Sequence, residues 1–193
     1  MNSEIILAWP TPIIRQNKVF NNQEQIKDLC EKSTETVDPI TGDMKRGTPI
    51  IDNYVIEDLK LWILESSREA ISSINQSMWN REYKPKFWDM WSWSSSDYDN
   101  PYHGHYNSSW GGAYCVDAGD ENFDNNNGST MLYSPLPWGT YADPGVAFLE
   151  RQSKQWHNLN TGDLLLFPFW VKHSAKYKGN KKRTVIGFSL VFD

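Results

Sequence analysis

Only two cysteines and four histidines occur among the 193 residues, and no long apolar run is present. Cys30 and Cys115 are too few to build a disulfide framework. No stretch approaches the roughly 18 apolar residues that a membrane-spanning helix needs. The first residues also lack the positive segment and cleavage site of a secretory signal. These absences predict a cytoplasmic protein without a membrane partner.

Positive charge is scarce as well. The 19 Lys and Arg residues are outnumbered by 24 Asp and Glu residues, which gives a formal net charge of −5. Proteins that bind nucleic acid through its phosphates present a basic face. We therefore expect no nucleic-acid partner.

Aromatic residues, in contrast, are abundant, with 10 Trp, 9 Tyr and 8 Phe. This content excludes a disordered chain, and the mean hydropathy of −0.64 fits a soluble globular protein. The length suits one domain spanning residues 1–193. The aromatic side chains are expected mainly in the walls of its core.

The patterns divide the chain into residues 1–84, an arm with helices, and residues 85–193, which are rich in strands. Residues 5–14 predict an edge strand or an extended arm, because two prolines interrupt them. Helical spacing predicts one helix after Asn22 and another over about 57–80, with a loop at 34–53. Strands are predicted at 87–93, 111–117, 129–134, 146–149, 163–168, 172–177 and 184–192. Helices followed by many short strands predict an α+β, mainly β fold with a sandwich or barrel-like core.

Three of the histidines form a candidate metal site. His103 and His105 are two residues apart, so both point to the same side of an extended segment. His173 follows an apolar strand and can complete a facial triad, which leaves coordination positions open for substrate and dioxygen. A His-x-His pair alone is also typical of two surface histidines. The fourth histidine, His157, is expected in a loop.

Arg183 stands ten residues after His173, at the start of the last predicted strand. An arginine that points into an apolar barrel requires an anion, and a carboxylate held bidentately is its natural partner. The alternative is a solvated arginine that ends a basic turn at residues 178–182.

Taken in order, these motifs resemble the iron(II)/2-oxoglutarate-dependent oxygenases, in particular the bacterial and phage set related to prolyl 4-hydroxylases. The resemblance is carried by Trp9–Ile13, His103-Gly-His105, Trp110–Val116, Gly162–Pro168, His173 and Arg183. It implies a double-stranded β-helix (jelly-roll) core at residues 85–193, with N-terminal helices buttressing one sheet. For a viral protein it implies the host cytoplasm.

The resemblance also implies the chemistry. Fe(II) would be bound by His103, His105 and His173, and Arg183 would bind the distal carboxylate of 2-oxoglutarate. The activity would be oxidative decarboxylation of 2-oxoglutarate, with O2 as second cosubstrate, coupled to hydroxylation of a peptidyl (prolyl-like) or small-molecule C–H bond. Most of the superfamily has a carboxylate at position 105. An alternative register therefore makes His105 the first ligand and places Asn107 second.

Two tyrosines are candidates for a hydrogen bond to 2-oxoglutarate. The family has a tyrosine pair where this chain has Tyr114-Cys115, so Tyr114 is one candidate and Tyr133, on the neighbouring strand, is the other. Two further functions stay open. His105 is compatible with a three-histidine cupin dioxygenase that does not use 2-oxoglutarate, and the tryptophans are compatible with a non-enzymatic β-sandwich that stacks on sugar rings.

Overall fold

The computed structural model describes residues 11–34, 49–75, 84–105, 107–120, 125–135 and 154–193. Its elements, in chain order, are β1 (Ile14–Asn17), α1 (Gln23–Thr34), a 3-10 turn (Tyr54–Ile56), α2 (Glu57–Asn75), β2 (Pro85–His103), β3 (Trp110–Asp117), β4 (Ser129–Tyr133), β5 (Lys154–Asn158), β6 (Asp163–Pro168) and β7 (His173–Phe192). The strand predicted at 146–149 and the motif residues Trp9 and Pro10 lie outside the described residues. Within the described part, no helix is long and apolar enough to cross a membrane.

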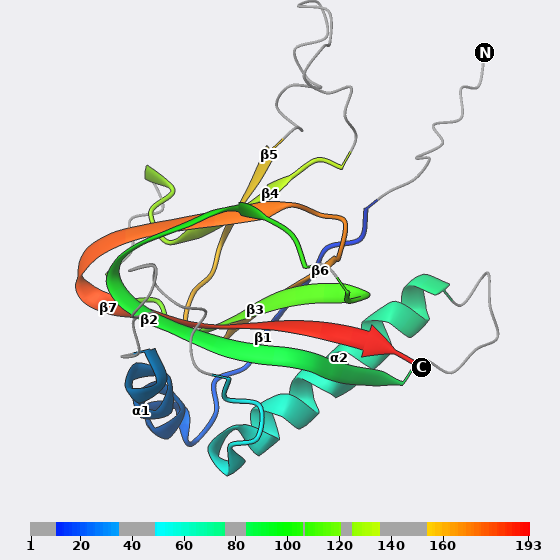
Figure 1. Ribbon diagram of the computed structural model, residues 1–193, viewed down its shortest axis with the longest axis horizontal. Coiled ribbons are helices and arrows are strands. Elements are labelled where there is room, and N and C mark those ends of the chain that lie inside the picture. The colour runs from blue at the N-terminus through cyan, green and yellow to red at the C-terminus, as the bar shows by residue number, and fades with distance from the viewer. Residues whose placement is uncertain (1–10, 35–48, 76–83, 106, 121–124, 136–153) are drawn as a thin grey trace, which may run out of the picture.

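The strands form one strongly curled antiparallel sheet. Its order is β1-β6-β3-β7-β4-β5, and β2 pairs with β7 along almost its whole length. The second half of β7 pairs with β3, whereas its first half pairs with β4. The two long strands, β2 and β7, therefore bend strongly along their length and give the sheet its curl (Figure 1). This arrangement confirms the predicted mainly β, jelly-roll architecture.

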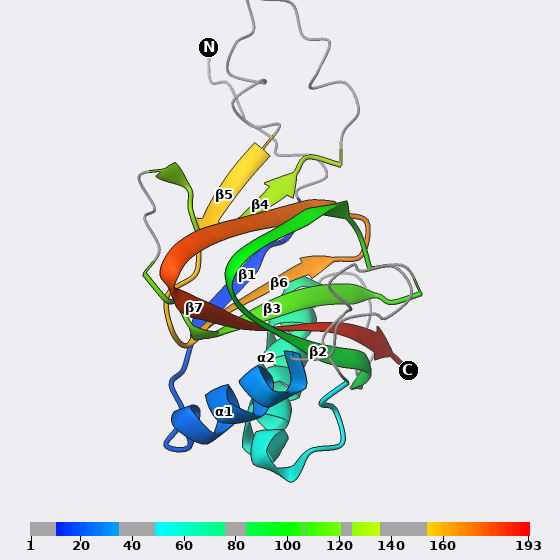
Figure 2. The same cartoon turned by 60° about the vertical axis from the view of Figure 1, so that its left-hand side comes forward.

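The two helices cover one face of the sheet, as Figure 2 shows. The apolar stripe of α2 is buried there, and Leu59 and Ile63 are fully inaccessible to solvent. Trp62 of α2 and Phe20 pack edge to face with Tyr114 of β3, at centroid distances of 6.1 Å from the Tyr114 ring. These contacts confirm the predicted helical buttress.

The basic residues near the C-terminus form a bulge within one strand, where the sequence predicts a turn between two strands. On β2, Asp97 pairs with Lys178 and Ser95 pairs with Arg183, so residues 179–182 of β7 have no counterpart. Asp120 accepts hydrogen bonds from the backbone amides of Asn180 and Lys181, which fixes the bulge. The strands predicted at 172–177 and 184–192 are thus one strand, β7.

The prediction of a loop at His157 is wrong. His157 lies in β5, paired with Thr130 of β4. This strand is mostly solvent-exposed and lacks the alternation that marks a half-buried strand.

Register shifts along β2 change which of its residues face the interior of the curl. They occur between Phe87 and Asp89, between Ser95 and Asp97, and between Asn100 and His103. A β-bulge adds one residue, so the side-chain alternation is inverted on its far side. As a result, the inward-facing residues of β2 are first odd-numbered, then even-numbered, then odd-numbered again: Trp91, Trp93, Tyr98, Asn100 and His103.

Candidate metal and cosubstrate site

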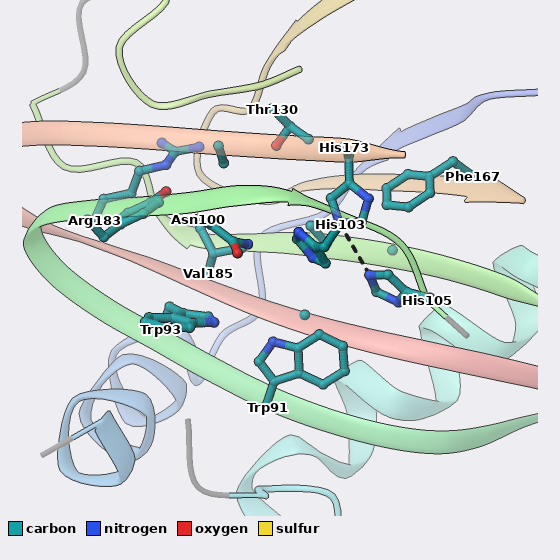
Figure 3. Close-up of a pocket in the computed structure, with 15 residues that line it drawn as sticks. Trp91, Trp93, Asn100, His103, His105, Thr130, Phe167, His173, Arg183 and Val185 are labelled. Atoms are coloured by element: carbon teal, nitrogen blue, oxygen red, sulfur yellow. Dashed lines mark hydrogen bonds between the residues drawn. The ribbon is translucent and has the colours of Figure 1, made fainter. Parts of the chain in front are cut away.

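The structure brings the three predicted histidines together inside the curl. Their potential ligand atoms all lie within 4.8 Å of one another, and Nε2 of His105 is 3.3 Å from Nε2 of His173. His103 ends β2 and is paired with His173, the first residue of β7. Figure 3 shows the three imidazoles grouped at one end of the pocket.

Hydrogen bonds orient two of these rings. Nδ1 of His103 lies 2.7 Å from the carbonyl oxygen of Pro101. A carbonyl only accepts, so this nitrogen carries the proton and Nε2 retains a lone pair. Nδ1 of His105 lies 2.9 Å from Oγ of Ser189. Outer hydrogen bonds of this kind hold metal-binding imidazoles in position.

Close packing adds to this orientation. A Cβ atom on Gly111 would stand only 2.7 Å from Nδ1 of His105, so glycine there lets the ring lie flat on β3. The ring of Phe167 lies 4.6 Å from that of His173, between centroids. Burial, and then the neighbouring His103 and His105, lower the pKa of His173 well below its ordinary value. Three converging imidazoles fit a divalent first-row transition metal such as iron.

Asn107, the second ligand of the alternative register, is exposed and has a left-handed φ of 64°. It lines a groove together with His103 and His105, but it is not part of the group of ligand atoms that the three histidines form.

Arg183 occupies the other end of the same pocket (Figure 3). Its side chain is 1% exposed, and its Nη1 and Nη2 atoms donate hydrogen bonds of 3.0 Å to the carbonyl oxygens of Ala118 and Leu159. Among the described lining residues it is the only one with a formal charge when the histidines are neutral. The space between the guanidinium and the imidazoles is a cavity of about 60 Å³. This end of the pocket is therefore suited to a carboxylate.

Neither tyrosine named from the sequence lines this pocket. Tyr114 points to the helix-covered face, where its hydroxyl donates to the carbonyl oxygen of Lys18 at 2.8 Å. Tyr133 has its hydroxyl 3.3 Å from Oγ of Ser174 and packs edge to face on Tyr102. Their strands turn these side chains away from the histidines.

A tyrosine that the sequence analysis missed, Tyr98, lies in the pocket beside Arg183. Burial raises the pKa of Tyr98, although the charge of Arg183 and a hydrogen bond between the two side chains oppose this. The phenol therefore stays protonated and can donate a hydrogen bond at neutral pH. Tyr98 faces inward because of the register shift after Ser95, a feature that the two-residue alternation does not reveal.

A cluster of imidazoles and a buried guanidinium in one pocket of a jelly roll are features expected of a metal-dependent enzyme whose ligand is an anion. Comparison with known proteins identifies the family to which the chain belongs. Residues 88–189, more than half of the chain, match the family described as putative 2OG-Fe(II) oxygenase. The chain belongs to this family and is a 2-oxoglutarate-dependent oxygenase that uses Fe(II). No curated protein sequence matches the chain.

Solved structures share the fold at low sequence identity. A prolyl-4-hydroxylase from Pseudomonas putida has a TM-score of 0.53 at 9% identity, covering 93% of this chain and 86% of its own. HygX from Streptomyces hygroscopicus, with nickel and 2-oxoglutarate bound, has a TM-score of 0.52 at 12% identity, covering 94% and 82%. The viral collagen prolyl hydroxylase of Paramecium Bursaria Chlorella virus-1, in complex with 2OG, has a TM-score of 0.51 at 8% identity, covering 92% and 94%.

Proposed function

We propose that His103, His105 and His173 hold the iron, that Arg183 and Tyr98 bind 2-oxoglutarate, and that the enzyme hydroxylates a C–H bond of a peptide or small molecule. The observation that carries the assignment is the presence of the buried guanidinium and the imidazole cluster at opposite ends of one pocket. A keto acid whose distal carboxylate meets Arg183 points its other end toward the histidines.

When bound, the iron supplies the activation of dioxygen and the decarboxylation of the keto acid. The chain supplies position and environment. Arg183 offers a charge-assisted hydrogen bond to the distal carboxylate, and the Tyr98 hydroxyl can donate a second one. Trp93 and Val185 line the space between the two ends with apolar surface (Figure 3). Ser189 and the carbonyl of Pro101 hold the two ligand rings that they contact.

The two other candidate functions are less well supported. A three-histidine dioxygenase without 2-oxoglutarate has no use for a guanidinium buried in the metal pocket, and the family match favours 2-oxoglutarate. A pure sugar-binding module does not need three converging imidazoles.

The test is cosubstrate binding by an Arg183→Met variant under anaerobic conditions. Wild-type protein with Fe(II) should develop a weak visible charge-transfer band on addition of 2-oxoglutarate. The variant should need more than roughly 100-fold higher 2-oxoglutarate, because a buried charge-assisted pair is lost. Lys182→Met, which changes the neighbouring exposed cation, is the control and should behave as wild type.

Absence of the band in wild type would contradict the proposal. Oxygenase activity that survives Arg183→Met unchanged would favour the three-histidine dioxygenase. Circular dichroism of the variant separates a binding defect from misfolding.

A further inference from the structure

Three rows of paired residues cross β2 and β7 between the proposed iron site and the arginine end of the pocket. The first row is formed by His103 and His173, and the third by Tyr98 and Tyr177. A strand advances roughly 3.3 Å per residue, so the row between them lies roughly 7 Å from each along β7. A ligand that spans the pocket therefore passes this middle row.

The middle row consists of Asn100, Ala175 and Thr130. Ala175 of β7 pairs with Asn100 of β2 on one side and with Thr130 of β4 on the other. All three residues line the pocket, and Figure 3 shows Asn100 between Arg183 and His103. The small side chain of Ala175, with a polar side chain on each side, leaves a passage between the two ends of the pocket.

The two polar side chains of the middle row have no hydrogen-bond partner within the part of the chain that the structure describes. Thr130 is only 8% exposed, and Asn100 is half-buried. Buried polar groups in native proteins are almost always hydrogen-bonded, because leaving one unpaired costs its desolvation free energy. These two groups are therefore satisfied by whatever fills the pocket, either water or a ligand.

The polar groups of the pocket wall favour an anionic ligand over water. No Asp or Glu is found among the described residues that line the inner pocket. Apart from the imidazoles and indoles, its polar side chains can all donate hydrogen bonds: Tyr98, Asn100, Thr130 and Arg183. A dicarboxylate accepts at both ends, and hydrogen bonds to a carboxylate are stronger than those to a neutral acceptor.

Asn100 and Thr130 differ in which end of the pocket they face. Asn100 lines both the inner pocket and the groove outside it, as His103 and His105 do. Thr130, like Arg183, lines the inner pocket only. The carbon atoms between the two ends of 2-oxoglutarate carry no oxygen or nitrogen. The Asn100 amide is therefore matched to the end of the ligand at the iron, and the Thr130 hydroxyl to the distal carboxylate.

We propose that the middle row is a second binding element for 2-oxoglutarate. The Asn100 amide donates a hydrogen bond to the carboxylate at the iron, the Thr130 hydroxyl donates one to the distal carboxylate, and Ala175 leaves room for the methylene groups between them. The inference rests on the proposed function, because it takes the histidine cluster as the iron site and Arg183 as the partner of the distal carboxylate.

The test is the equilibrium binding of 2-oxoglutarate to Mn(II)-loaded protein, measured by titration calorimetry. Asn100→Ala and Thr130→Val should each raise the Kd by roughly tenfold, because each removes a hydrogen bond to a charged group. Thr130→Ser keeps the hydroxyl and should bind nearly as wild type does. Ala175→Val should raise the Kd as well, because its larger side chain narrows the passage.

Ser174→Ala is the matched control. It removes a hydroxyl next to Ala175 in sequence, but this hydroxyl lies 3.3 Å from that of Tyr133, which is outside the pocket. The Kd for 2-oxoglutarate should therefore stay unchanged. The affinity for Mn(II) without 2-oxoglutarate is the second readout, and it should be unchanged in every variant because the middle row contains no proposed metal ligand.

The anaerobic charge-transfer band of the Fe(II) protein with 2-oxoglutarate separates the two polar residues. Asn100→Ala should shift the wavelength of this band, because a hydrogen bond to the end of the ligand at the iron changes the electron density of that end. Thr130→Val should leave the wavelength unchanged once the protein is saturated with 2-oxoglutarate.

Three results would overturn the inference. Variants that bind 2-oxoglutarate as wild type does would mean that the middle row faces only water. A loss of Mn(II) affinity as large as the loss of 2-oxoglutarate affinity would mean that the row merely supports the histidines. An unshifted band in Asn100→Ala would remove its contact at the iron. Failure of the proposed function is seen separately, because wild-type protein would then not bind 2-oxoglutarate at all.

Discussion

The two faces of the curled sheet are built by the same strands but have opposite character. Along the second half of β7, Ile186, Phe188 and Leu190 are fully buried under the helices. The residues that alternate with them, Val185 and Gly187, face the pocket together with Arg183. The helix-covered face is filled by tightly packed apolar side chains. The pocket face has polar groups around a cavity. Successive side chains of one strand thus serve different purposes, stability of the fold on one face and the proposed chemistry on the other. Substitutions on the helix-covered face should therefore change stability, and substitutions on the pocket face should change ligand binding or activity.

The largest effect is expected for removal of a metal ligand. His173→Ala should weaken metal binding by well over the roughly 100-fold that loss of an outer hydrogen bond to a ligand costs, and should abolish turnover. Its free energy of unfolding without metal should change little. His157→Ala, outside the cluster, is the control. Metal content and succinate formation are the measurements, and near-normal values for His173→Ala would contradict its assignment.

On the closed face, Phe188→Ala should act through stability. Truncation of a fully buried phenylalanine leaves a cavity and costs about 3–5 kcal/mol. Val185→Ala, one alternation away and partly open to the pocket, should cost about 1 kcal/mol. Urea unfolding of both variants compares the faces within one strand. Equal losses would mean that the pocket face is packed as tightly as the helix face.

The glycine pair on β3 offers a sharper contrast. A Cβ on Gly111 would meet the ring of His105, whereas a Cβ on Gly112 would lie 2.4 Å from the ring of Phe188. Gly111→Ala should displace His105 and lower metal affinity, whereas Gly112→Ala should destabilise the fold by about 1–3 kcal/mol through overpacking. Both variants need metal titration and urea unfolding. A reversed pattern would show that the assignment of faces is wrong.

The smallest effects are expected for two tyrosine hydroxyls. Tyr98→Phe should raise the KM for 2-oxoglutarate by roughly tenfold or less, since one hydrogen bond to a charged group is lost. Tyr114→Phe should leave that KM unchanged and reduce stability by about 1 kcal/mol, because its bond to the Lys18 carbonyl is structural. Steady-state kinetics of the two variants measures the KM for 2-oxoglutarate. A raised KM in Tyr114→Phe would indicate that Tyr114 does bind the cosubstrate.

The parts of the fold that the sequence predicts are those with strong apolar periodicity. α2 and the fully buried β6 are examples, and Gly111 and Gly112 belong to the motif that marks β3. The second half of β2 escapes prediction because its outward residues are charged. Asp97 and Asp99 form ion pairs with Lys178 and Lys176 across the strand pair, and in sequence such residues look like loop.

Prediction of the site residues from the sequence has the same limit. His103, His105, His173 and Arg183 are recognisable by residue type, order and spacing, and the structure groups them. Tyr98 is not recognisable in this way, because its inward direction depends on a bulge and its neighbour Arg183 is far along the chain. Register shifts are set by long-range pairing, which local periodicity does not encode.

β7 also determines when the site can form. It is the central strand of the sheet, pairing with β2, β3 and β4, and it carries His173 and Arg183, the proposed last ligand and the proposed cosubstrate arginine. His105 precedes His173 by 68 residues, several seconds at ordinary rates of translation. The nascent chain therefore exposes a two-histidine half-site before any pocket exists, and contacts of such long range form slowly. We therefore expect the proposed iron site to be completed late in folding, when this strand docks.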